Sequence, residues 1–175
     1  MLSCCHLTLH INSISLTFRL LFTQYRTSGA RISVIEQDAS SSSGFQEVYS
    51  EATPWDKDYD DADTWMNVTE KLLLSAANGL GSLESIASIC VSGTSASCLI
   101  VDRETQAVTR AARMYNYDVV SNADEGSTAG SDAVELLEKH APPRHTARAL
   151  TGSLAKLLTW AIEKPLTDSE ALCRT

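Results

Sequence analysis

Basic residues are outnumbered in this sequence, with 14 Lys and Arg against 22 Asp and Glu and a formal net charge of -8. Binding to nucleic-acid phosphates needs clustered Lys and Arg, so this balance argues against nucleic acid as a partner. An anionic membrane surface is disfavoured for the same reason. The sequence also lacks an apolar run long enough to span a bilayer. We therefore expect no nucleic-acid partner and no membrane partner.

Paired cysteines and metal-ligand spacings are absent as well. The five cysteines are odd in number, and no two of them have C-x-x-C spacing. A disulfide framework and a structural zinc site are therefore disfavoured, and reduced thiols are expected. The acidic run that starts at Asp56 imitates a calcium loop, but Asp61 and Asn67 stand where an EF-hand needs Gly and Glu. We assign no metal ligand.

Acidic residues are missing from the first 35 positions, and the first one is Glu36. A secretory signal opens with basic residues before its apolar part. This segment has no Lys or Arg there, so we do not expect secretion. Its Ser- and Thr-containing, acid-poor character is closer to an organelle transit peptide, and an incorrectly assigned first exon explains it equally well. We expect residues 1–26 to be an atypical N-terminal segment, and the protein to be cytoplasmic or plastid-located.

The remaining chain is long enough for one domain with a hydrophobic core. Alternating or continuous apolar runs predict an antiparallel meander of three strands, followed by two buried strands, and helical spacing predicts three helices. Strands that precede the helices indicate a mixed α/β sheet rather than a Rossmann sheet. The expected strands are 16–22, 31–36, 46–50, 86–91 and 98–101, and the expected helices are 63–78, 133–140 and 150–163.

The first expected helix has the clearest signals. Apolar residues recur from Trp65 to Ala76 at i, i+3, i+4 and i+7 spacing. Asp63 is the expected N-cap, and Gly79 and Gly81 are expected to end the helix. In the last expected helix, the predicted buried face consists of Leu154, Leu157, Leu158 and Ala161.

Three segments in order carry a resemblance to a known family. Residues 27–35 read TSGARISVI, residues 89–102 read ICVSGTSASCLIVD, and residues 114–116 read MYN, with Asp118 shortly after. The first is similar to the D-x-G-T-S-x-x-R phosphate loop and following strand of FGGY-type sugar kinases. The second resembles the family's strand–turn–strand, whose turn reads D-G-T-S in many members, and the third resembles its sugar-side element.

The resemblance implies an actin-like, ribonuclease H-like mixed α/β fold, with residues 27–175 forming an incomplete N-terminal kinase domain. The complete protein would phosphorylate a ketose sugar such as ribulose or xylulose with ATP and Mg²⁺, and the chain's later part is similar to a plant-type pentulose branch. The implied cofactor-binding residues are Thr27, Ser28, Gly29 and Arg31. The implied substrate-binding residues are Ser92, Gly93, Thr94, Ser95, Asn116 and Asp118.

Elementary chemistry is consistent with this resemblance. A Thr-Ser-Gly turn between two strands can present N–H groups and hydroxyls to a phosphate. The alternative is an ordinary hairpin turn, because Ser and Gly favour turns in any case. The two histidines at the di-proline turn, His140 and His145, are expected to be helix-end and loop residues. Trp55, Trp65 and Trp160 are expected to pack rather than to stack on a ligand.

The sequence also departs from the family. Gln24 and Arg26 stand where the family has the Asp and the Gly of its phosphate loop, and Ser92 replaces the Asp of many members. Gln supplies no carboxylate for a metal, and Arg lacks the small size that lets backbone approach a phosphate. The family's catalytic Asp and adenine site are expected beyond residue 175, so we assign no catalytic residue and expect this chain to be inactive alone. A non-catalytic sugar-binding module and a non-functional gene fragment remain alternatives.

Overall fold

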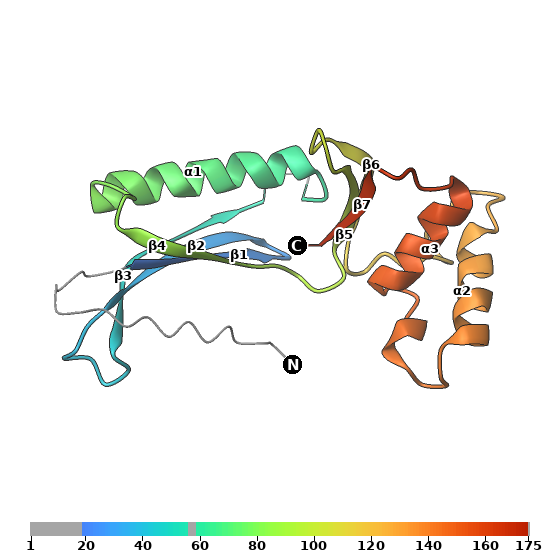
Figure 1. Ribbon diagram of the computed structural model, residues 1–175, viewed down its shortest axis with the longest axis horizontal. Coiled ribbons are helices and arrows are strands. Elements are labelled where there is room, and N and C mark those ends of the chain that lie inside the picture. Colours follow the sequence, from blue (N-terminus) through green and yellow to red (C-terminus); the bar gives the residue numbers. More distant parts are fainter. Residues whose placement is uncertain (1–18, 56–58, 175) are drawn as a thin grey trace.

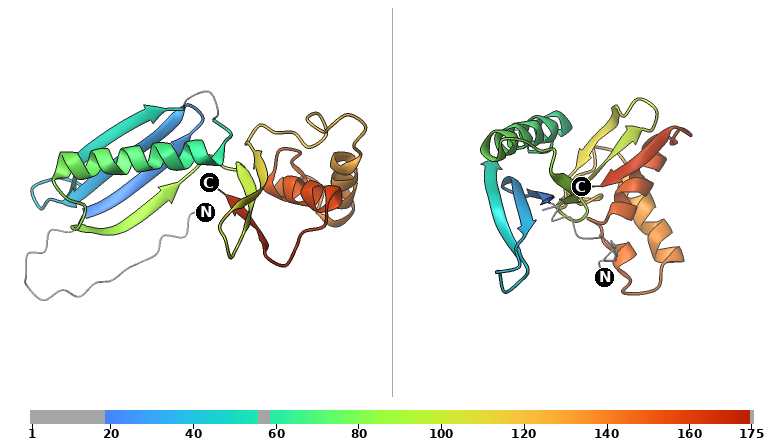
Figure 2. Two further views of the ribbon diagram at one scale, coloured as in Figure 1. Left: turned by 90° about the horizontal axis from the view of Figure 1, so that it is seen from above. Right: turned by 60° about the vertical axis from the view of Figure 1, so that its left-hand side comes forward.

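The computed structural model describes residues 19–55 and 59–174, which form two β-sheets and three α-helices. The molecule is elongated, with a four-stranded sheet under α1 at one end and the helices α2 and α3 at the other (Figures 1 and 2). The strands are β1 (Arg19–Arg26), β2 (Gly29–Gln37), β3 (Phe45–Pro54), β4 (Ile86–Ser92), β5 (Cys98–Asp102), β6 (Val108–Arg113) and β7 (Glu170–Arg174). The helices are α1 (Ala62–Leu80), α2 (Ala129–His140) and α3 (Ser153–Glu163), with a short 3-10 turn at Thr146–Arg148. The expected mixed α/β fold is confirmed.

The four-stranded sheet has the strand order β3-β2-β1-β4. β1, β2 and β3 form the expected antiparallel meander, and β4 lies parallel to β1. Alternate residues of β1 and β2 face α1, so Leu21, Ile32 and Val34 are buried while their neighbours face the opposite side. The first strand begins later than expected, at Arg19, and the first three residues of the predicted strand 16–22 lie outside the described part of the chain.

Helix α1 covers one face of this sheet and packs against β2 and β3. Its buried residues are Trp65, Val68, Leu72 and Ala76, which confirms the predicted spacing. The predicted N-cap was wrong by two positions, because Asp61 accepts the Thr64 backbone N–H at 2.8 Å and Asp63 lies in the first turn. The helix ends at Gly81, which has the left-handed conformation (φ 78°) that favours glycine.

The expectation that residues 86–91 form a buried strand was wrong. Every residue of β4 after Ile86 is exposed, including Ile89 (60%) and Val91 (62%). The parallel register places Ile89 beside Leu21 on the face that carries α1. Because α1 lies over β2 and β3, it leaves this part of the face uncovered. An apolar run therefore predicted the strand correctly and its burial incorrectly.

The second sheet has the strand order β6-β5-β7. We expected residues 98–101 to continue the central sheet after β4, but β5 instead pairs with β6 and β7, both antiparallel. β5 is largely buried, and its Cys98 and Ile100 pack against Trp160 of α3. Trp160 is therefore a packing residue, as expected, and the Arg113 guanidinium lies 4.6 Å from the centre of its ring.

Helices α2 and α3 pack together around Val119, Leu137 and Ala155. The buried residues of α3 are Ala155, Lys156, Thr159 and Trp160. Of the predicted apolar face, Leu157 and Leu158 are half-buried and pack against the cores, whereas the prediction was wrong for Leu154, which is 43% exposed. No helix among the described residues is long and apolar enough to cross a membrane. The calcium-like run starting at Asp56 begins outside the described residues.

Candidate functional site

The turn between β1 and β2 contains Thr27 and Ser28 and leads into Gly29, three of the four expected cofactor-binding residues. Gly29 is pressed against β3: a Cβ built there lies 2.3 Å from the Thr53 carbonyl oxygen and 2.8 Å from the Pro54 Cα. Any side chain at this position therefore collides with backbone. The close approach fixes the end of the hairpin against the neighbouring strand.

The turn after β4 lies at the same end of the sheet. Because β1 and β4 are parallel, and Gln24 lies beside Ser92, both strands finish together. The Thr94 hydroxyl donates a hydrogen bond of 3.3 Å to the carbonyl oxygen of Tyr25. The structure thus brings Ser92–Ser95 close to the residues just before Thr27.

Aromatic side chains line a small hollow beside Thr94 of the second turn. Tyr25 stacks on Trp55 with ring centroids 6.1 Å apart and planes 7° from parallel. The Trp55 indole N–H donates to the Arg26 carbonyl oxygen at 2.7 Å, and the Trp65 indole N–H donates to the Tyr59 carbonyl oxygen at 2.7 Å. Both tryptophans therefore have structural contacts, as their predicted packing role requires.

Lys156 connects the second turn to the third expected segment. This side chain is fully buried, and its Nζ donates to the carbonyl oxygens of Ala96 (2.7 Å) and Met114 (2.6 Å). The Ser97 hydroxyl accepts from the Tyr115 backbone N–H at 3.1 Å. Burial lowers the Lys156 pKa from its ordinary value. The residues after Ser95 and those before Asn116 are thereby held side by side.

Asn116 and Asp118 differ in what they can offer a ligand. Asn116 is exposed. The Asp118 carboxylate accepts the backbone N–H groups of Val120 and Ser121, both at 2.9 Å, and these bonds hold its pKa below the usual value. The Asp118 backbone N–H in turn donates to the Asn122 side chain. The structure therefore gives Asp118 a local turn-forming role.

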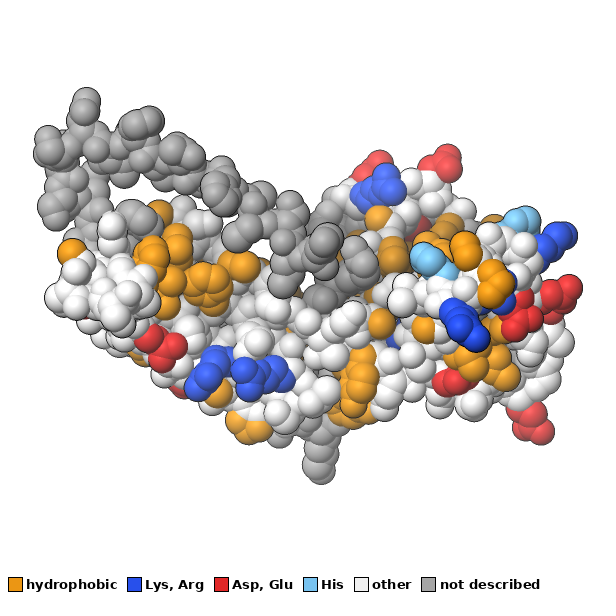
Figure 3. Space-filling model, turned by 90° about the horizontal axis from the view of Figure 1, so that it is seen from below, with side chains coloured by type: hydrophobic (Ala, Val, Ile, Leu, Met, Phe, Trp, Pro, Cys, Tyr) orange, Lys and Arg blue, Asp and Glu red, His pale blue; other side chains and the backbone are white. Residues whose placement is uncertain are grey.

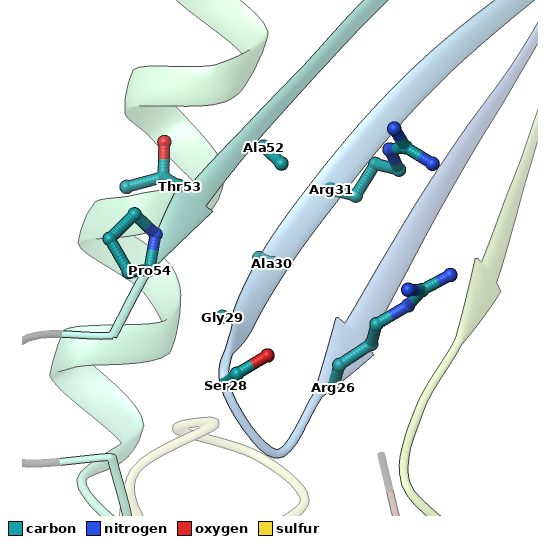
Figure 4. A pocket seen from close by; sticks show the side chains of 8 residues that line it. All are labelled: Arg26, Ser28, Gly29, Ala30, Arg31, Ala52, Thr53 and Pro54. Carbon is teal, nitrogen blue, oxygen red and sulfur yellow. The ribbon is translucent and has the colours of Figure 1, made fainter.

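An open pocket of about 420 Å³ adjoins the β1–β2 turn. It is lined by Arg26, Ser28, Gly29, Ala30, Arg31, Ala52, Thr53 and Pro54, and Figure 4 shows Arg26 and Arg31 extending from neighbouring strands to the same side. The pocket contains no carboxylate. Of its two basic residues, Arg31 is an expected cofactor-binding residue, whereas Arg26 was expected only as a departure from the family.

The residues at this turn do not fit a magnesium ion. Mg²⁺ in phosphate sites is bound through carboxylates, and here Gln24 and two arginines occupy the relevant end of the hairpin. Among the residues that the structure describes, no three His, Cys, Asp or Glu side chains come together to hold a metal ion. His145 instead accepts the Ala147 backbone N–H through Nδ1, and His140 is exposed at the end of α2.

Two residues of this region, Lys156 and Arg26, had no predicted role in the site. Lys156 gave no signal, because a lysine within a helix is ordinarily exposed and its carbonyl partners lie 42 and 60 residues away along the chain. Arg26 could have been recognised through strand alternation, which places Gln24, Arg26 and the cross-strand partner Arg31 on one face.

Comparisons with known proteins give a consistent fold. Neither a protein-family model nor a curated protein matches the sequence. The structure is similar to a xyloylose kinase from Brucella ovis (TM-score 0.60, 16% identity), covering 85% of this chain and 29% of that one. It is also similar to a xylulose kinase from Bifidobacterium adolescentis (TM-score 0.58, 18% identity; 86% and 30% covered). A gluconate kinase from Lactobacillus acidophilus gives a TM-score of 0.56 at 10% identity, with 85% and 29% covered.

These likenesses establish that the chain has the fold of part of a sugar kinase. The expected actin-like fold is confirmed. The chain spans about 30% of the length of the solved kinases that it resembles. The fold that the sequence resemblance implies and the fold of these solved structures therefore agree.

Proposed function

We propose that this chain is the sugar-binding part of a carbohydrate kinase-related protein. The observation that carries the proposal is the meeting of the β1–β2 and β4–β5 turns at one end of the sheet, joined by the Thr94–Tyr25 hydrogen bond. A ketose such as ribulose or xylulose would lie against the second turn, and the first turn would face the phosphate. The activity of the whole protein would be transfer of a phosphoryl group from ATP to the sugar.

The second turn offers the chemistry that a polyol needs. Ser92, Thr94 and Ser95 carry hydroxyls that both donate and accept hydrogen bonds, and the exposed Asn116 adds an amide. The buried Lys156 supports both segments from beneath through the carbonyl oxygens of Ala96 and Met114. A polar surface held in this way is suited to hydroxyl-rich ligands, because its groups are ordered before binding.

A second candidate function is a sugar-binding module without catalysis. It is favoured by Gln24 and Arg26, which remove the carboxylate and the glycine that the family's phosphate loop uses. The two candidates share the sugar site and differ in nucleotide chemistry. Binding of the sugar without binding of ATP supports the module, whereas ATP binding that depends on the sugar supports the kinase.

Isothermal titration calorimetry of the purified chain with ribulose, xylulose and ATP tests both candidates. We expect ketose binding, weakened about tenfold by Asn116→Ala through loss of a hydrogen bond to the ligand. Asn78→Ala is the matched control, because Asn78 is an exposed asparagine on α1. Absence of ketose binding by a folded chain contradicts the proposed function.

A further inference from the structure

We propose that Arg26 and Arg31 form a binding site for a phosphate group that requires no divalent metal ion. The site lies at the end of the β1–β2 hairpin, on the face of the sheet turned away from α1. The inference rests on the proposed function for the nature of the ligand. That two arginines take the place of a metal ion is inferred from the residues of this chain.

Strand alternation sets the direction of both side chains. The Tyr25 hydroxyl is 2.6 Å from the hydroxyl of Thr69 on α1, so Tyr25 faces the helix and its neighbours Gln24 and Arg26 face away from it. Arg31 lies directly opposite Gln24 in the antiparallel register and shares its face. Figure 3 shows basic side chains gathered on this face of the four-stranded sheet.

Neither guanidinium is neutralised by an acid within the described residues. The ion pairs there join Arg19 to Glu36, Arg110 to Glu170 and Arg113 to Glu163. The Arg26 Nε donates to the Gln24 side-chain oxygen at 2.7 Å, which orients the guanidinium and leaves its terminal nitrogens available. Gln24, where the family has a metal-binding carboxylate, thus positions a cation in this chain.

The space beside the two arginines suits a compact anion. The pocket of about 420 Å³ is open to solvent, and its other lining residues are small: Ser28, Gly29, Ala30, Ala52, Thr53 and Pro54. Arginine binds phosphate oxygens in a bidentate manner, and two of them supply the positive charge that a metal otherwise brings. A phosphate monoester or the end of a polyphosphate fits this chemistry, whereas a neutral sugar does not.

The test is calorimetric titration of the full 175-residue chain with inorganic pyrophosphate, in EDTA and again with Mg²⁺. We expect binding in EDTA that Mg²⁺ does not strengthen, because the ion neutralises the charge that the arginines recognise. Arg26→Ala and Arg31→Ala should each weaken binding about tenfold, as loss of a charged hydrogen bond predicts. Raising the salt concentration should weaken binding as well.

Arg103→Ala is the matched control, because Arg103 is an exposed arginine in the turn between β5 and β6. Circular dichroism of every variant establishes that it is folded, and Arg26→Gln and Arg31→Gln replace any alanine variant that is not. No binding in EDTA, a requirement for Mg²⁺, or equal losses in Arg103→Ala each contradict the proposal.

Parallel titrations with a pentose 5-phosphate and with ADP identify the source of the phosphate group, and tighter binding of either by the wild-type than by the arginine variants supports the site. Titration with free xylulose separates this inference from the proposed function. A chain that binds xylulose but not pyrophosphate contradicts the arginine site and leaves the sugar site standing. A chain that binds pyrophosphate but not xylulose contradicts the sugar site and supports the arginine site.

Discussion

The Nζ of Lys156 lies 2.6 Å from the carbonyl oxygen of Met114, deep beneath the surface that carries the candidate sugar-binding residues. A second bond to Ala96, at 2.7 Å, joins the β4–β5 turn to the same amine. Ala96 has a left-handed backbone conformation (φ 67°), which an alanine rarely adopts. The lysine thus stabilises a strained turn and the segment beside it with one side chain.

Substitution Lys156→Met should destabilise the protein by about 3 kcal/mol, because it leaves two buried carbonyl groups without their donor. Urea denaturation followed by circular dichroism measures the change in the free energy of unfolding. Lys139→Met is the control, since Lys139 is exposed on α2, and it should change stability by less than about 0.5 kcal/mol. Equal effects of the two substitutions would show that the buried bonds contribute nothing.

Gly29→Ala should destabilise the hairpin by about 2 to 3 kcal/mol, because the new Cβ collides with the Thr53 carbonyl oxygen and the Pro54 Cα. Gly44→Ala is a useful comparison. A Cβ built at Gly44 has no neighbouring atom within 4 Å, and the residue has a φ of 75°, so this substitution introduces only backbone strain of about 1 to 2 kcal/mol. Thermal unfolding of both variants checks the order. A smaller effect at Gly29 than at Gly44 contradicts the close approach of β2 and β3.

Glu170 should make stability depend on acidity. Hydrogen bonds from the Arg110 side chain, and then from the Thr167 backbone N–H, lower the Glu170 pKa from 4.5 to about 2. The unfolded state binds a proton more readily, so this contribution is complete above about pH 4.5 and is lost as the pH falls towards 2. Melting temperatures measured from pH 6 to pH 2.5 should fall less steeply in Glu170→Gln than in the wild-type protein. The exposed Glu135→Gln serves as the control, and an unchanged slope in Glu170→Gln contradicts the assignment.

The purified chain should show no phosphoryl transfer to ribulose or xylulose. Phosphoryl transfer relies on positioned groups and on charge stabilisation around the phosphates, and Gln24 supplies no carboxylate to hold a metal ion there. A coupled assay of ADP release checks this expectation. Turnover above the control without protein, abolished by Thr27→Ala, would show that the β1–β2 turn supports catalysis after all.

Local signals were sufficient to predict the strands of the first sheet and the buried face of α1, but not the exposure of β4. Period-2 alternation around Ile32 and Val34 predicts a half-buried strand, and the spacing from Trp65 to Ala76 predicts the buried face of α1. Two other strands gave no usable signal. β6 carries two arginines and has no buried residue, and β7 forms only by pairing with β5, about 70 residues earlier in the sequence.

Some features of the candidate site could likewise be predicted from the sequence, and others could not. The residues of the two turns can be recognised from their order in the sequence, and their meeting follows from one parallel pairing between β1 and β4. The local role of Asp118 could not be predicted, because it depends on how the following backbone folds back onto the carboxylate. Lys156 could not be predicted either, since its burial depends on two distant loops.

The position of β4 has a practical consequence for work on the purified chain. Within the described residues this strand pairs only with β1, so the N–H and C=O groups along its outer side have no strand partner there, next to the exposed Ile89 and Val91. An exposed edge strand of this kind readily pairs with strands of other molecules. Particle size should therefore grow with protein concentration in light scattering, and calorimetric affinities will be meaningful only below the concentration at which that growth begins.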